Sequence, residues 1–145
     1  MAILLDTNIL LRIAQPHSAQ APIAERALSA LHQRNESLHI ASQNLVEFWA
    51  VATRPVAENG LGMTVEQAMG QLLALKRLFT LLPEAPLQSE WEQLVTTYRV
   101  SGKNSHDARL VAAMMVHGTR GILTFNVQDF ARYAGILVLD PRTIV

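Results

Sequence analysis

The chain has 145 residues, of which 50% are hydrophobic and 17% are charged, a composition that suits one globular domain with one core. Twelve basic residues balance twelve acidic ones, so no global positive field attracts a polyanion. The absence of cysteine excludes disulfides, thiolate metal sites and cysteine nucleophiles. The longest apolar run, Leu110 to Val116, is far shorter than a membrane span, and without a secretory signal we expect a cytoplasmic protein that contacts no membrane.

The first half of the chain alternates apolar strands with helices. The apolar run 2–5 ends at Asp6, and apolar residues then recur at helical spacing. A buried strand that leads into a helix is therefore expected, with Asp6 at the strand's carboxyl end. Further along, the patterns predict a helix over about 22–34, a strand near 38–41, a helix over about 42–54 and a loop over 54–63. Ser42 is the expected N-cap of the third helix.

The second half continues the alternation. Thr64 and Gln67 have the spacing of a capping box that opens a helix, and Pro86 suits the start of another. In chain order we expect a helix over about 64–79, a strand over 80–82, helices over about 86–100 and 105–117, and strands over 121–125 and near 136–139. Because the crossovers are too long for hairpins, the whole chain, 1–145, is predicted to be one α/β domain with a mainly parallel sheet covered by helices on both faces.

Acidic side chains follow the predicted strands or begin the predicted helices. Ligands of open parallel sheets bind outside the carboxyl ends of the strands, which selects Asp6, Asp107, Asn126 and Asp129. Glu47 joins them from the helix over about 42–54, on a different face from that helix's core residues. Taken singly, most of them have ordinary explanations, because an acid can complement a helix dipole, cap a turn or face solvent. Together they would repel one another unless a divalent cation lay between them. Oxygen ligands favour Mg²⁺ or Mn²⁺ over zinc, and the five histidines have no zinc-site spacing.

Four segments of the chain resemble the PIN-domain nucleases, and in particular the VapC-type toxins of bacterial toxin–antitoxin pairs. They follow the family's order and spacing over nearly the whole chain, as Ile3–Asn8, Ser42–Glu47, His106–Ala113 and Leu123–Phe130. The resemblance implies a three-layer α/β/α sandwich and metal-dependent cleavage of RNA. It also implies inhibition by a small cognate antitoxin and suggests a homodimer, in which the apolar helix around 72–79 supplies part of the interface.

The resemblance also assigns roles to individual residues. Asp6, Glu47 and Asp107 match three family acids directly. Many relatives have a fourth acid where this chain has Asn126, and the nearest acid here is Asp129, so both are assigned to the metal site and Asp129 joins the catalytic acids. Donors that would orient the acids are Thr7, Asn8 and Thr124. Candidate phosphate contacts are Arg12, Arg54, Lys103 and Arg109.

The expected chemistry is attack of an activated water on an RNA phosphodiester. One or two divalent ions would lower the pKa of the water and clamp the phosphate, and a carboxylate would accept the proton. Phosphoryl transfer through Asp6 would want a second acid at position 8, where this chain has Asn8. The alternative that stays open is a nuclease-like module that binds RNA or a protein without cutting, with Asn126 in place of an acid as its sign.

Overall fold

A five-stranded parallel sheet forms the centre of the computed structural model, which describes residues 1–145. Its strands lie in the order β3-β2-β1-β4-β5, and every neighbouring pair is parallel. Their bounds are Ala2–Leu5 (β1), Ser37–Ile40 (β2), Thr80–Leu81 (β3), Gly121–Leu123 (β4) and Leu137–Leu139 (β5). The chain builds the sheet outward from β1 to one edge and then returns to β4 on the other side. The order of the strands therefore reverses between β1 and β4, where parallel sheets bind ligands.

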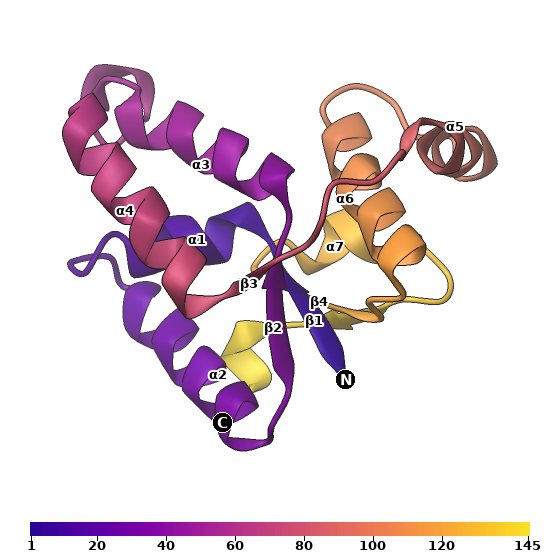
Figure 1. The fold of residues 1–145 in the computed structure, drawn as a ribbon, viewed down its shortest axis with the longest axis horizontal. Helices are drawn as coiled ribbons and strands as arrows, with labels where there is room; N and C mark the ends of the chain where they lie inside the picture. Colours follow the sequence, from indigo (N-terminus) through magenta and orange to yellow (C-terminus); the bar gives the residue numbers. More distant parts are fainter.

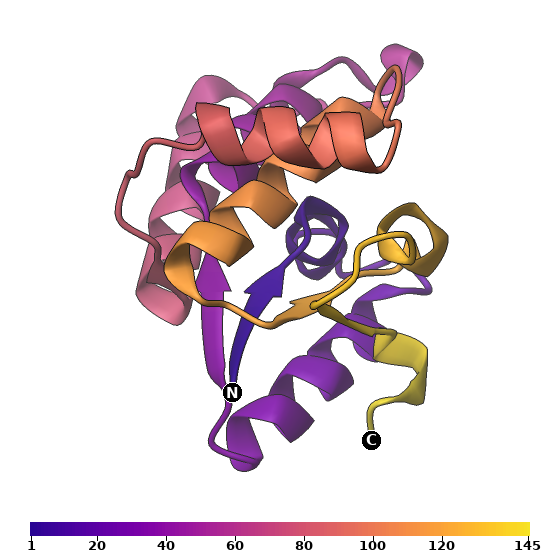
Figure 2. The ribbon, with the colours of Figure 1, turned by 90° about the vertical axis from the view of Figure 1, so that its right-hand side faces the viewer.

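Helices cover both faces of the sheet (Figure 1). They are Thr7–Ile13 (α1), Ala21–Gln33 (α2), Ser42–Thr53 (α3), Val65–Leu78 (α4), Gln88–Thr97 (α5), Asn104–His117 (α6) and Val127–Phe130 (α7), with 3-10 turns at Val56–Glu58 (η1) and Pro141–Thr143 (η2). Alternate residues of β1 point to opposite faces, as strand geometry requires. Ile3 and Leu5 join the core under α1 to α4, whereas Leu4 joins the core under α5 to α7. In Figure 2, α5 packs on the outside of α6, and the C-terminal turn η2 lies beside α2.

Most predicted boundaries agree with the structure to within a few residues. Thr64 and Gln67 form the predicted capping box, with bonds of 3.1 and 2.9 Å. Ser42 as an N-cap is wrong: the cap is Ala41, because its backbone N–H donates to the Asn44 side chain at 2.8 Å and the helix starts one residue early. Pro86 precedes α5 and does not begin it. No helix has both the length and the apolarity needed to cross a bilayer.

Candidate active site

Asp6 lies at the reversal of strand order, directly after β1. Its backbone N–H donates to the Leu123 carbonyl at 2.9 Å, which ties the end of β1 to the end of β4. The side chain is 7% exposed. One carboxylate oxygen accepts from the Thr7 N–H at 2.8 Å and caps α1, and the other accepts from the Thr124 hydroxyl at 2.7 Å. The Asp6 side chain is thus held by the start of α1 and by the residue that follows β4.

Glu47 reaches the same place from α3. Its Oε1 accepts from the Thr7 hydroxyl at 2.6 Å, and the Thr7 oxygen in turn accepts from the side chain of Asn44 at 3.1 Å. Its Oε2 accepts from Gln43 at 3.0 Å, and the same amide nitrogen donates to the His106 carbonyl at 2.8 Å. Glu47 is therefore hydrogen-bonded directly to α1 and, through Gln43, linked to the first turn of α6.

Asp107 lies in that first turn of α6 and is half-buried. The start of the helix is anchored by Trp91 of α5, whose indole N–H donates to the Ser105 carbonyl at 2.8 Å. The pKa of Asp107 is raised to about 7, mostly by burial and also by the negative charges of Asp6, Asp129 and Glu47, while Lys103 lowers it. The other three predicted acids therefore lie near enough to Asp107 for their charges to affect its pKa.

The pKa of Asp6 also responds to the neighbouring acids. It is raised to about 6, mostly by burial and to a lesser extent by the charges of Glu47 and Asp129, while the hydrogen bonds from Thr124 and Thr7 lower it. A carboxyl group that is desolvated beside other acids is costly to ionise unless a cation joins it. Neither salt bridge in the structure involves one of these acids.

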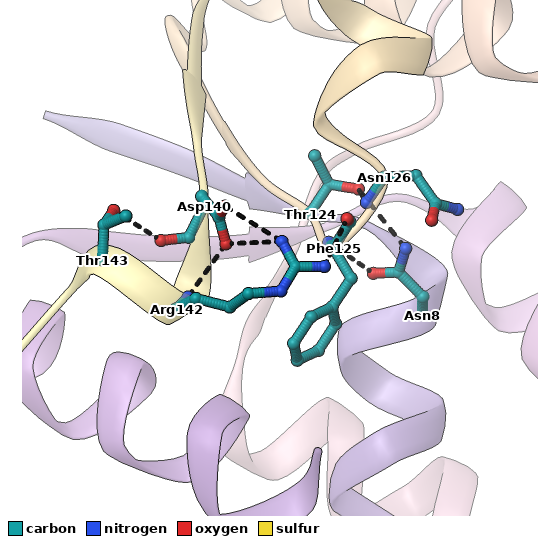
Figure 3. A network of polar contacts seen from close by, with 7 residues as sticks. All are labelled: Asn8, Thr124, Phe125, Asn126, Asp140, Arg142 and Thr143. Carbon is teal, nitrogen blue, oxygen red and sulfur yellow. Dashed lines mark hydrogen bonds and ion pairs between the residues drawn. The ribbon is translucent and has the colours of Figure 1, made fainter.

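Asn126 and Asp129 occupy different places around α7. Asn126 precedes the helix, and its backbone N–H donates to Thr124 at 2.9 Å. Its side chain is exposed and points away from the neighbouring network in Figure 3. Asp129 lies in the first turn of α7, is half-buried, and acts electrostatically on both Asp6 and Asp107. Asp129 is therefore near enough to Asp6 and Asp107 to raise their pKa values, whereas the Asn126 side chain faces solvent.

The whole arrangement matches a known family. A family model described as PIN domain matches residues 3–136. The chain belongs to the PIN-domain family. It is similar to ribonuclease VapC24 of Mycobacterium tuberculosis, with 27% identity over 140 residues that cover 96% of each chain. The predicted resemblance to PIN-domain nucleases and VapC proteins is thereby confirmed.

Solved structures share the fold of this PIN domain. VapBC2 from Rickettsia felis, bound to a DNA fragment from its promoter, superposes with a TM-score of 0.73 at 17% identity, over 97% of this chain and 98% of the other. VapC20 of Mycobacterium tuberculosis, a toxin that cleaves the sarcin–ricin loop, gives a TM-score of 0.63 at 20% identity, over 93% and 96% of the two chains. These likenesses confirm the predicted α/β/α sandwich.

The carboxylates of this PIN domain are not arranged as a complete set of metal ligands. No three of the His, Asp or Glu side chains stand in a group that could hold an ion as they lie. The donor chemistry nevertheless fits a hard divalent cation, because the acids are oxygen donors, Asp6 is buried, and neither it nor Asp107 forms a salt bridge.

The basic residues predicted near the site differ in their surroundings. Lys103 precedes α6, and its charge lowers the pKa of Asp107 against the larger effects of burial and acidic neighbours. Arg12 instead donates to Gln20 at 2.6 Å and to Gln15 at 2.9 Å, which fastens α1 to the start of α2. Lys103 is thus the better candidate for a phosphate contact.

Sequence reasoning missed two residues that orient Glu47. Gln43 precedes Glu47 by one helical turn, a spacing at which side chains meet on one helix face. Asn44 is fully buried and bonded to both Ala41 and Thr7. The available signal was polarity in an otherwise apolar helix: a buried amide must find partners, and these two find them next to the acids.

Proposed function

We propose that this PIN domain is a divalent-metal-dependent endoribonuclease and the toxin of a toxin–antitoxin pair. The observation that carries the proposal is the cluster of Asp6, Glu47, Asp107 and Asp129, whose charges raise the pKa of Asp6 and Asp107 without a salt bridge to neutralise them. The family and the similarity to ribonuclease VapC24 support RNA as the substrate.

The residues of the site divide the work of hydrolysis. We expect Asp6, Glu47, Asp107 and Asp129 to hold Mg²⁺ or Mn²⁺, which when bound would supply a low-pKa water and a counter-charge for the phosphate. Thr124 and Thr7 fix the orientation of Asp6 and Glu47 by donating to them. Asp107 is only partly buried and can accept a proton from an attacking water.

Removing the metal tests the proposal. Purified protein is expected to cleave single-stranded RNA with Mg²⁺ or Mn²⁺ and to stop in excess EDTA, with activity returning when Mn²⁺ is restored. An Asp107→Asn preparation, purified in the same way, controls for contaminating ribonuclease. Cleavage that persists in EDTA would contradict the metal mechanism. A protein that binds RNA but does not bind Mn²⁺ and does not cleave RNA would favour the non-catalytic alternative.

The fourth ligand position gives a separate prediction. Asp129→Asn should weaken Mn²⁺ binding about tenfold, because it removes a charge that acts on both Asp6 and Asp107. Adding Asn126→Asp should restore part of the affinity by returning a carboxylate to the end of β4. Manganese titration of the two single variants and the double variant measures this. Wild-type affinity in Asp129→Asn would remove Asp129 from the site.

Two protein partners of this chain are proposed, one from the structures of its relatives and one from its exposed apolar surface. Relatives of known structure are VapBC pairs, some of them bound to DNA, and we propose that a small antitoxin inhibits this chain as well. We also propose a homodimer. Helix α4 leaves Met69, Leu73 and Leu78 exposed to 44, 44 and 68%, which is apolar surface that a second copy could cover.

A further inference from the structure

The C-terminal turn η2 forms a polar network that includes none of the four acids of the candidate site. Arg142 donates from Nη1 to both carboxylate oxygens of Asp140, at 3.0 and 2.9 Å, and from Nη2 to the Phe125 carbonyl at 3.1 Å (Figure 3). Its guanidinium also lies 5.4 Å from the centre of the Phe125 ring. The planar guanidinium fixes the directions of its two Nη groups relative to each other, so Arg142 joins the residue after β5 to the segment after β4.

The segment around Phe125, which Arg142 contacts, carries parts of the proposed metal site. The Phe125 N–H donates to the side chain of Asn8 at 3.3 Å, so α1 holds this residue from one side while Arg142 holds it from the other. The preceding residue, Thr124, donates to Asp6. The following residues begin α7, and the Asp129 N–H donates to the Asn126 carbonyl at 3.0 Å.

We propose that Arg142 is a positioning residue for the acidic site: through the Phe125 carbonyl it sets where Thr124 and Asp129 lie. The inference rests on the proposed function, because the ligands it positions are those of the proposed metal site. Arg142 and Asp129 line the same open cleft, of about 470 Å³, together with Asp140 and residues 125–128. Arg142 and Asp140, which we call the clamp, therefore lie in the same cleft as Asp129, whose position the clamp sets.

The clamp acts through geometry and not through its charge. Asp140 neutralises Arg142 with a two-point ion pair, and the charges that act on Asp6 and Asp107 come from other residues. The ion pair is partly exposed, with 47 and 27% of the two side chains accessible, so its loss should lower the melting temperature by about 3 °C or less. The site and the overall stability are thereby separable.

The test compares Arg142→Ala and Arg142→Lys with Arg34→Ala. Arg34 is the matched control, because it also donates to a C-terminal carbonyl, that of Val145 at 2.7 Å, but on the α2 side. We expect Mn²⁺ affinity and kcat to fall about tenfold in Arg142→Ala, with the control at wild-type values. Arg142→Lys should recover little, since one ammonium group lacks the fork. Asp140→Asn is a second variant that should weaken Mn²⁺ binding less.

Several outcomes would overturn the inference. Unchanged Mn²⁺ affinity in Arg142→Ala would remove the positioning role, and tighter binding would show a simple field effect, because deleting a positive charge favours a cation. A rise in KM alone would make Arg142 an RNA contact. Amide hydrogen exchange over residues 124–130 is a readout that needs no metal: it should quicken in Arg142→Ala only, and unchanged exchange would contradict the clamp. Wild-type protein that fails to bind Mn²⁺ would instead count against the proposed function.

Discussion

Replacing Asp6 or Asp107 with asparagine is expected to abolish RNA cleavage, by at least about 100-fold, while leaving the metal-free fold as stable as the wild type or more stable. Such losses are typical when an element of a catalytic metal site is removed. The unusual part is the stability. At pH 7.5 Asp6, whose pKa is about 6, is ionised although burial and the neighbouring acids disfavour its charge. The neutral amide avoids this cost to the free energy of unfolding, which is up to about 3 kcal/mol.

Part of that gain is lost in the Asp6 variant. Asparagine has one side-chain oxygen in place of two, so it cannot accept from both the Thr124 hydroxyl and the Thr7 N–H, and a lost hydrogen bond costs about 1 kcal/mol. Urea unfolding in EDTA measures the net effect, with Glu92→Gln on exposed α5 as the charge-loss control. If both Asp variants were strongly destabilised without metal, Asp6 and Asp107 would have structural roles and the ligand assignment would be wrong.

Sequence position alone located the acids at the ends of elements. Asp6 follows a buried strand and Asp107 begins a buried helix, and both facts follow from apolar periodicity. Parallel strands present their carboxyl ends on one edge of the sheet, so residues distant in sequence converge there. Glu47 needed the family likeness as well, because a helix glutamate has no strand end to mark it.

The connections between these positions were beyond the sequence. The bond from Gln43 to the His106 carbonyl joins α3 to α6, and the bond from Arg142 to the Phe125 carbonyl joins η2 to the end of β4. Both depend on strand order and helix packing, which local patterns do not encode. A carbonyl acceptor also leaves no trace in residue type, so neither partner was recognisable from composition or spacing.

The misplaced helix start has a similar cause. Ser42 is a good N-cap by type, yet Asn44 supplies its side-chain oxygen to the Ala41 N–H and the helix begins earlier. The same Asn44 also donates to Thr7. A residue that serves the site and the helix end together moves the boundary away from the position that capping preference alone selects.

The pH dependence of stability tests the acid cluster without RNA. Below about pH 3.8, Asp6 and Asp107 are protonated in both states and add nothing. Between 3.8 and their folded pKa values of about 6 and about 7, the folded protein keeps protons that the unfolded chain releases. The slope of unfolding free energy with pH is then negative. We expect metal-free protein to lose stability, on the order of 3 kcal/mol, from pH 4 to pH 7, with a smaller further loss up to pH 8 as Asp107 becomes fully ionised in the folded protein.

Two comparisons isolate the source of this trend. His39 has a pKa lowered by burial, and by the charge of His117, so it favours folding as the pH rises and opposes the trend. The Asp6→Asn, Asp107→Asn double variant keeps His39 and should therefore show a flat or rising profile. Saturating Mn²⁺ should restore stability near pH 7 in the wild type through binding to the folded state, and should leave the double variant unmoved. Urea unfolding at pH 5, 6, 7 and 8, with EDTA or with Mn²⁺, measures all four cases. Wild-type stability that rose with pH in EDTA would mean that the acids are neutralised within the fold, which would remove the physical reason for a metal between them.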